Sequence, residues 1–199
     1  MHFRPKEGNR ERWEIFIDDE KWRDVHRSIF GRHPSLPPIS DEKELQSIFD
    51  AYEYRRVKGN VLWRLSTQTY HSEQLVKLLR DRLVQSHTID RVIRKYREMG
   101  ALDDEAWLQS FMQTQKQRYS FRHILNKLRT KGLSAETISH LSEEWKNPEE
   151  ELEALQHLMR TRYRSKDLND YKVRQKVMAS LARKGYSFDQ IQHVFKSIL

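Results

Sequence analysis

The fold class follows from one stretch, residues 120–141, which reads SFRHILNKLRTKGLSAETISHL. Ile124 and Leu128 are four residues apart, and Ile138 and Leu141 are three apart, so each pair marks one face of an α-helix. A base, Lys131, is suited to the end of the first helix, and a glycine follows it, as is common just after a helix. The stretch therefore predicts two consecutive amphipathic helices joined by a short turn.

The same pattern occurs 49 residues earlier and 53 residues later, with a base again at Arg82 and Lys184. Gly185 follows the later base, whereas Leu83 stands where the first copy would have glycine. The equivalent apolar positions are Leu75, Leu79, Ile89 and Val92 in the first copy and Val177, Leu181, Ile191 and Val194 in the third. A further amphipathic helix precedes each copy, marked by Val57, Val61, Leu62 and Leu65, then Leu108, Phe111 and Met112, then Leu152, Leu155, Leu158 and Met159. We therefore predict an all-α fold of three tandem three-helix repeats that form an elongated curved array.

The N-terminal part differs from the rest. Residues 13–17 and 21–25 are rich in strand-forming residues and flank a plausible turn at 18–20, which predicts a β-hairpin. A lone hairpin is marginal in water, so it should pack on another element. Residues 28–30 could add a helical turn, and residues 33–38 have the composition of a linker. The predicted divisions are 1–39 (hairpin extension and linker), 40–99 (repeat 1), 100–147 (repeat 2) and 148–199 (repeat 3).

Composition supports a folded helical chain and limits its chemistry. Six glycines and five prolines in 199 residues argue against a turn-rich β-fold, and 21 aromatic residues (8 Phe, 8 Tyr, 5 Trp) argue against disorder. The absence of cysteine excludes disulfides and Cys-ligated metal sites. No apolar run approaches the ~18 residues of a membrane helix, and residues 1–6 lack a secretory apolar segment. We expect a cytoplasmic protein without cofactors.

Positive charge is concentrated in two stretches. The net charge is +8, but residues 54–131 hold 17 Lys/Arg against 7 Asp/Glu, and residues 160–184 hold nine against two. Residues 136–153, between them, hold seven acids and one base. Such blocks indicate a surface that binds an anionic partner, rather than charge that is spread evenly and serves only solubility.

Four motifs in order resemble the RecX family of RecA regulators. They are residues 100–107 (GALDDEAW), Tyr119-Ser120 with residues 128–133 (LRTKGL), residues 181–188 (LARKGYSF), and the hairpin residues 15–22 (IFIDDEKW). The resemblance covers nearly the whole chain. Leu83 and the charged segment around residues 146–153 depart from the family pattern.

The resemblance implies an activity that the periodicity does not show. A RecX-like protein would bind the helical RecA filament on single-stranded DNA and could also bind double-stranded DNA. It would modulate recombination and DNA repair, most often by inhibiting RecA. We expect a monomer that does not bind membranes. Two alternatives stay open: a general DNA-binding protein without RecA specificity, and an adaptor whose basic face meets acidic protein.

No residue pattern points to catalysis or to a metal. Asp103, Asp104 and Glu105 are consecutive, so on a helix they point in different directions, and we expect Asp103 to cap a helix with the other two acids near its positive end. The nine histidines form no metal-ligand spacing, and no phosphate loop or nucleophile motif is present. Trp63, Trp107 and Trp145 could stack on bases, but their helical pattern favours core packing. Tyr70 and Tyr119 occupy equivalent positions just before a helix, and this equivalence favours packing between helices there too.

Basic side chains on the predicted helices are the better candidates for a binding surface. Contacts between such residues and phosphates would add salt dependence rather than sequence specificity. If they are only solvated, single substitutions will have almost no effect. The candidates for RecA and DNA binding are Arg80, Arg82, Arg91, Arg94 and Lys95 in repeat 1; Arg122, Lys127, Arg129 and Lys131 in repeat 2; and Lys172, Lys176, Arg183 and Lys184 in repeat 3.

Overall fold

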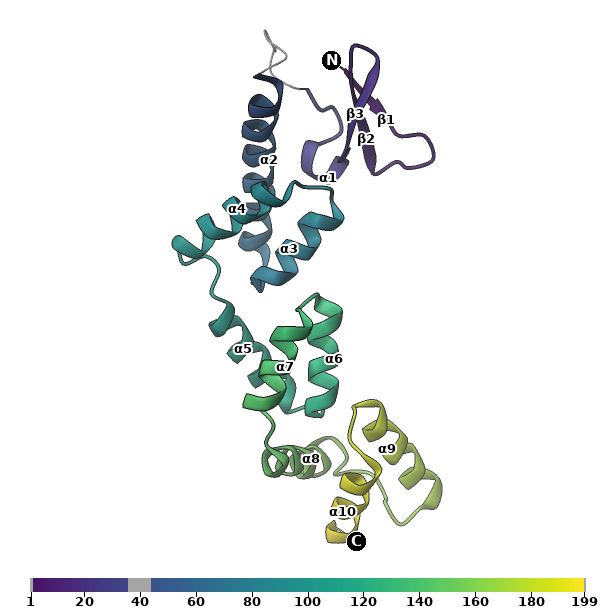
Figure 1. Cartoon of the computed structure of the whole chain (residues 1–199). Helices are drawn as coiled ribbons and strands as arrows, with labels where there is room; N and C mark the ends of the chain where they lie inside the picture. The colour runs from purple at the N-terminus through teal and green to yellow at the C-terminus, as the bar shows by residue number, and fades with distance from the viewer. Residues whose placement is uncertain (1, 36–43, 199) are drawn as a thin grey trace. The chain divides into compact units, whose positions relative to one another are not determined.

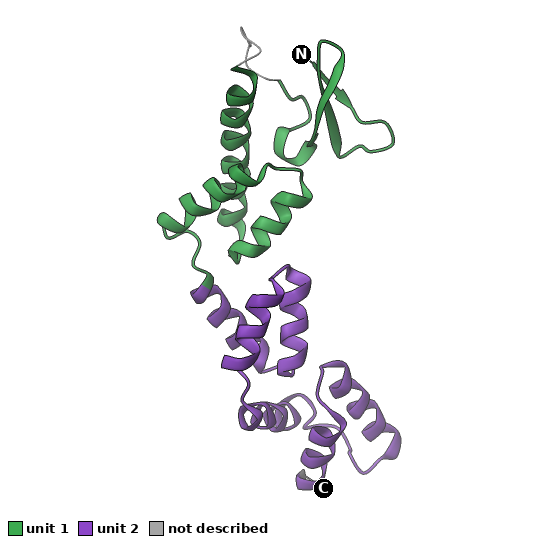
Figure 2. Cartoon of the chain, viewed as in Figure 1, with its two compact units in different colours: residues 1–104 green, residues 105–199 purple. Residues whose placement is uncertain are grey.

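The structure, a computed structural model, describes residues 2–35 and 44–198 (Figure 1). The chain divides into two compact units, residues 1–104 and 105–199 (Figure 2). The first unit holds a small sheet and helices α1 to α4, and the second holds helices from α5 to α10. The all-α prediction with an N-terminal β element is confirmed.

A three-stranded antiparallel sheet, in the order β1-β2-β3, forms the N-terminal element. Strands β2 (Arg12–Ile17) and β3 (Glu20–His26) are the predicted hairpin, and Asp18 and Asp19 turn between them with φ of 46° and 64°. Strand β1 (His2–Pro5), which pairs with β2, was missing from the prediction. Helix α1 (Arg27–Phe30) is the expected single turn.

The sheet shares a hydrophobic core with the first repeat. Ile15 and Val25 belong to the same buried cluster as Phe49 and Val57 on α2 (Leu45–Thr67). The indole Nε1 of Trp13 donates to the carbonyl oxygen of Gly31 at 3.2 Å, which ties the sheet to the end of α1. The hairpin therefore packs on a helix, as expected for an element that is only marginally stable by itself. Residues 36–38 of the predicted linker and the boundary at residue 39 lie outside the described residues.

Three sets of helices follow the sheet, each with the predicted short turns. The middle helix of each set is preceded by a residue that accepts hydrogen bonds from its first turn: His71, Ser120 and Asp170. The helices are α2, α3 (Ser72–Asp81) and α4 (Ser86–Glu98); α5 (Asp104–Lys116), α6 (Phe121–Lys131) and α7 (Ala135–Glu144); and α8 (Pro148–Arg162), α9 (Tyr171–Arg183) and α10 (Phe188–Ile198).

Each set has its own hydrophobic core. The buried clusters lie in residues 15–102, 124–141 and 155–195. All twelve apolar positions predicted from the repeat are at most 3% exposed. The helical periodicity thus identified the core correctly, while the exact repeat boundaries stay a prediction.

Two residues of α2 correct the predicted packing. Leu62, expected on the apolar face, is 54% exposed, and Trp63, expected in the core, is 62% exposed. Val57, Val61 and the partly buried Leu65 face the core in this part of the helix. Leu62 and Trp63 follow Val61 directly, so the turn of the helix directs them away from that face.

Leu83 adopts the conformation that its glycine counterparts adopt. Its φ is 60°, against 98° for Gly132 and 94° for Gly185. The turn after α3 therefore keeps the left-handed geometry, at the steric cost of a side chain in that region. Among the described helices, none combines the length and apolar character needed to cross a membrane.

Candidate nucleic-acid interface

The candidate bases of the first unit lie on α3 and α4. Arg80, Arg91, Arg94 and Lys95 are exposed, and the guanidinium of Arg91 lies 3.9 Å from the ring centroid of Tyr54. A stacked guanidinium keeps its edge free for hydrogen bonds, so Arg91 is held in place while still able to meet an anion.

Arg82, at the end of α3, differs from these exposed bases. Its side chain is half-buried, and Nη1 is a buried atom with no hydrogen-bond partner in the structure. Burial, followed by repulsion from Arg64, lowers the pKa of Arg82. Its Nη1 donor is therefore desolvated without compensation, which is costly for a charged group.

In the second unit, the end of α9 approaches the start of α6 closely. The backbone N–H of Ser120 donates to the carbonyl oxygen of Lys184 at 3.0 Å, and Nζ of Lys184 donates to the carbonyl oxygen of Arg118 at 3.3 Å. A Cβ built on Gly185 would lie 2.3 Å from Oγ of Ser120. Glycine at 185 thus permits the approach that holds Lys184 beside the segment before α6.

Two of the candidate bases meet at one tyrosine. Nζ of Lys127 lies 3.3 Å, and Nζ of Lys184 4.8 Å, from the ring centroid of Tyr119. The imidazole of His123 stacks on the same ring at 4.7 Å with an interplanar angle of 6°. We call Arg118, Tyr119, His123, Lys127, Arg162 and Lys184 the Tyr119 cluster.

Charges within the Tyr119 cluster repel one another. Burial, then Arg162, and then Lys127 and Arg118 lower the pKa of Lys184, although Tyr119 opposes this. Burial, then Lys127 and Lys184, lower the pKa of His123. Within residues 2–35 and 44–198, none of the ion pairs pairs a carboxylate with Lys127, Lys184, Arg118 or Arg162. The cluster is a local excess of positive charge.

The other candidate bases of the second unit are exposed and do not join this cluster as a set. Arg122 reaches the carbonyl oxygen of Gly185 at 3.5 Å, and Arg129 donates to Asn126 at 2.8 Å. Nζ of Lys131 lies 5.9 Å and 5.6 Å from the ring centroids of Trp107 and Phe111. The remaining three are Lys172, Lys176 and Arg183, all exposed on α9.

Two carboxylates bind the N-terminus of a middle helix in the same way. Asp104 accepts from the backbone N–H and the Oγ of Ser72, both at 2.6 Å, at the first residue of α3. Glu151, near the start of α8, accepts from the backbone N–H of Phe121 at 2.8 Å, at the first residue of α6. Each acid lies in the first turn of a helix and binds the positive end of an earlier helix in the sequence.

These contacts revise the interpretation of the acidic motif. Asp104 binds a neighbouring helix and Arg97, at 2.8 Å, rather than only favouring its own helix start. Burial raises the pKa of Asp104, but hydrogen bonds from Ser72 and Arg97 outweigh it and hold this pKa below its usual value. Helix α5 begins at Asp104, one residue after the expected cap Asp103.

The comparisons with known proteins agree with this repeat architecture. A family profile described as RecX, third three-helix domain, matches residues 149–195. A regulatory protein RecX of Clostridioides difficile is 26% identical over 198 residues, covering 96% of this chain and 91% of the relative. Another, of Listeria welshimeri, is 24% identical over 185 residues, covering 92% and 69%.

The chain is similar to RecX proteins over nearly its whole length.

Solved RecX structures have the same fold. A crystal structure of a regulatory protein RecX superposes with a TM-score of 0.57 at 23% identity, covering 93% of this chain and 94% of the other. RecX from Lactobacillus salivarius gives 0.54 at 19% identity, covering 74% and 97%. The RecX resemblance inferred from four short motifs is confirmed.

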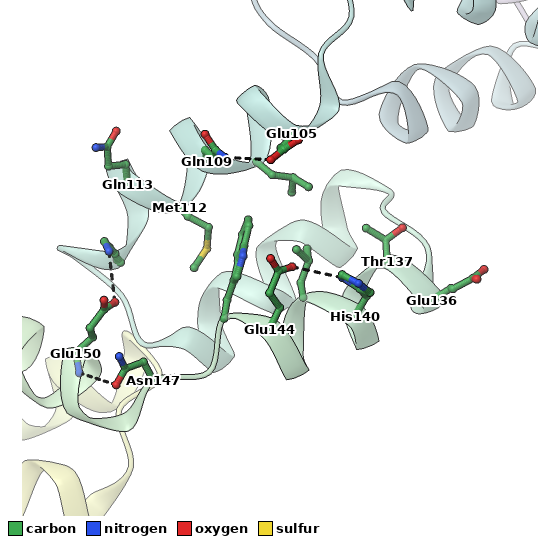
Figure 3. A pocket seen from close by; sticks show the side chains of 14 residues that line it. Glu105, Gln109, Met112, Gln113, Glu136, Thr137, His140, Glu144, Asn147 and Glu150 are labelled. Carbon is green, nitrogen blue, oxygen red and sulfur yellow. Dashed lines mark hydrogen bonds and ion pairs between the residues drawn. The ribbon is translucent and has the colours of Figure 1, made fainter.

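One cavity in the second unit has the wrong charge for an anion. It encloses about 1030 Å³ and lies among α5, α7 and the start of α8 (Figure 3). Four glutamates line it, and Lys116 is engaged by Glu150 at 3.4 Å. In the described part of the chain, no group of three or more His, Cys, Asp or Glu side chains is placed to share a metal ion. We therefore place the candidate interface on the bases rather than in this cavity.

Sequence reasoning missed three members of the Tyr119 cluster. Arg118, His123 and Arg162 were not among the candidate bases, and Tyr119 was assigned to packing alone. Tyr119 does pack against the core of its helix set, but the ammonium groups of Lys127 and Lys184 also lie against its ring. Its position just before a helix, repeated at Tyr70, was the available signal. Trp107 and Trp145 pack as predicted.

Proposed function

We propose that this chain is a non-enzymatic regulator that binds the RecA filament on single-stranded DNA through its basic face and lowers RecA activity. The observation that carries the proposal is the Tyr119 cluster, in which two candidate bases converge and form no ion pair with a carboxylate of the described residues. A surface with excess positive charge suits a filament that offers both DNA phosphate and acidic protein. The name of the relatives, regulatory protein RecX, supports a regulatory role.

The proposal extends to the organisation and location of the protein. We propose that the repeats at 40–99, 100–147 and 148–199 present their bases to successive parts of the filament, that the protein acts as a monomer, and that it works in the cytoplasm. The candidate bases from Arg80 to Lys184 are distributed over all three repeats, which supports contacts at more than one place.

The test is RecA-dependent ATP hydrolysis on single-stranded DNA, titrated with this protein at two salt concentrations. We expect hydrolysis to fall at substoichiometric protein, and the double variant Lys127→Glu, Lys184→Glu to require about ten-fold more protein. The control is Lys146→Glu, Lys196→Glu, which changes the charge equally at exposed residues outside the candidate set. Unchanged hydrolysis with the wild-type protein would contradict the proposal.

The same cluster also favours a second candidate function, general DNA binding without RecA specificity, because lysines meet phosphates in any sequence. Loss of hydrolysis only when the protein saturates the DNA would indicate this alternative. Binding to RecA in the absence of DNA would indicate the adaptor.

A further inference from the structure

The Tyr119 cluster has the composition of an anion site rather than of a structural ion pair. Two ammonium groups lie against one aromatic ring, and Lys127 and Lys184 come from different helix sets, 57 positions apart in the sequence. Lysines brought together in this way repel each other. In the part of the chain that the structure describes, no carboxylate forms an ion pair with either lysine. A bound anion would offset the repulsion.

The positions of the bases are fixed by contacts other than ion pairs. Nζ of Lys127 donates to Oε1 of Gln115 at 2.9 Å, and Nζ of Lys184 donates to the carbonyl oxygen of Arg118 at 3.3 Å. Each ammonium group has three donors, so both keep further donors for a ligand. The close approach at Gly185 fixes the backbone beside Lys184.

The chemistry favours phosphate over carboxylate. Lysine acts on phosphate as a point charge, and the tetrahedral oxygens of a phosphodiester can accept from ammonium groups that approach from several directions. A carboxylate has its two oxygens in one plane and is matched best by the planar fork of a single arginine. In the cluster it is the two ammonium groups that lie against the Tyr119 ring. Arg118 and Arg162 add positive charge beside Lys184.

We propose that the Tyr119 cluster binds one backbone phosphate of a nucleic acid strand, with Lys127 and Lys184 as the direct ligands. The Tyr119 ring holds the two ammonium groups apart, since both lie against it. The stacked imidazole of His123 covers the ring as well. The biological role of this site rests on the proposed function, but the site itself requires no RecA.

His123 provides a local reporter, because Lys127 and Lys184 both lower the pKa of its imidazole. The experiment is an NMR titration of His123 in the full chain, without ligand, with inorganic phosphate, with an oligothymidylate, and with poly-glutamate. An opposite charge within ~4–6 Å favours the charged imidazole. We therefore expect phosphate and oligothymidylate to raise the pKa of His123 by about one unit.

Variants separate this site from charge in general. Lys184→Gln and Lys127→Gln should each raise the pKa of His123 in the free protein and abolish the further rise on adding oligothymidylate. Each should also reduce the salt dependence of oligothymidylate binding by about 0.7 in the log–log slope. Lys196→Gln, an exposed lysine on α10, should keep both responses. The His123 resonance itself reports whether each variant is folded.

Three results would overturn the site. The pKa of His123 could stay constant while oligothymidylate binds, or respond to inorganic phosphate but not to the strand. Poly-glutamate could also raise it as much as oligothymidylate, which would assign the cluster to acidic protein. Because the titration contains no RecA, a failure here would leave inhibition of ATP hydrolysis intact. Conversely, a failure of that inhibition would leave the His123 response intact.

Discussion

Gly185 meets two requirements at once. Its φ of 94° lies in the left-handed region, and a Cβ there would approach Ser120 and His123 to 2.3 Å and 2.7 Å. Gly100 has a similar φ of 67°, but a Cβ on it would meet nothing within 4 Å. Comparing alanine variants at Gly100 and Gly185 therefore separates the cost of the left-handed backbone from the cost of a steric clash.

We expect Gly100→Ala to lower the free energy of unfolding by about 1 kcal/mol, from the left-handed conformation alone. Gly185→Ala should cost at least about 1 kcal/mol more, because atoms of α6 must also move. Urea unfolding followed by circular dichroism measures both. Equal losses in the two variants would show that the approach to Ser120 has no energetic weight.

The pH dependence of stability depends on His71. Its Nδ1 accepts from the backbone N–H of Glu73 at 3.2 Å, so the cap needs a neutral ring, and burial lowers the pKa of His71 although Asp104 and Glu73 oppose this. An unfolded histidine titrates near ~6.5, so the unfolded state gains its proton first as the pH falls. Stability from this group is complete above about pH 6.5 and decreases below it.

Replacing His71 by serine, the residue that caps α6, should remove this contribution. Between pH 6.5 and 5.5 we expect the wild type to lose more stability than His71→Ser, by up to about 1.4 kcal/mol per pH unit. Burial, then Arg82, also lowers the pKa of His26, but this effect is common to both proteins and cancels in the comparison. Parallel losses in urea unfolding at the two pH values would contradict this role for His71.

At the scale of elements, two middle helices have their first turns bound by carboxylates from elsewhere in the chain. Asp104 and Glu151 each accept from the first backbone N–H of a middle helix. Glu151 also accepts from Nε2 of Gln190 at 2.9 Å, so this acid additionally ties α10 to α6. The acidic segment, whose role the sequence left open, thus supplies such a contact.

Asp104→Asn should speed hydrogen exchange at the Ser72 amide and lower the free energy of unfolding by about 2 kcal/mol. The reason is that an amide nitrogen would replace one of the two accepting oxygens and face buried donors. Glu105→Gln, at the next and exposed residue, is the matched control. If the control accelerates exchange at Ser72 equally, the protection of this amide does not depend on the Asp104 carboxylate.

The sequence could predict helices, but it could not predict a very short strand or contacts between distant segments. Helical periodicity depends on neighbours three and four residues apart, so it located Leu79, Leu128 and Leu181 in the core. Strand β1 is four residues long and ends in proline, too short for a periodic signal. The Tyr119 cluster joins Arg118 to Lys184 across 66 positions, and no local pattern reports such a contact.

For the molecule as a whole, the important feature is that each helix set has a separate core. Leu79 and Leu181 occupy equivalent positions in the first and third sets, and both are fully buried. In repeat arrays, stability is approximately a sum of repeat and neighbour contributions, so damage in one set should stay largely local.

Leu181→Ala should destabilise the third set by about 2–5 kcal/mol through the cavity it leaves. We expect amide exchange to accelerate in α9 and α10 and to remain near the wild-type rate in α3 and α4. Leu79→Ala should give the reverse pattern. Uniform acceleration along the chain in either variant would mean that the array unfolds as one cooperative body.

The exposure of Trp63 has an optical consequence. The chain has five tryptophans, and the other four, at positions 13, 22, 107 and 145, are all partly shielded from solvent, whereas Trp63 is 62% exposed. Trp63 should therefore dominate the long-wavelength fluorescence and be the indole most accessible to collisional quenchers such as acrylamide. A partner that covers this part of α2 would shift the emission to the blue and protect it from quenching, so the unlabelled protein carries its own binding signal.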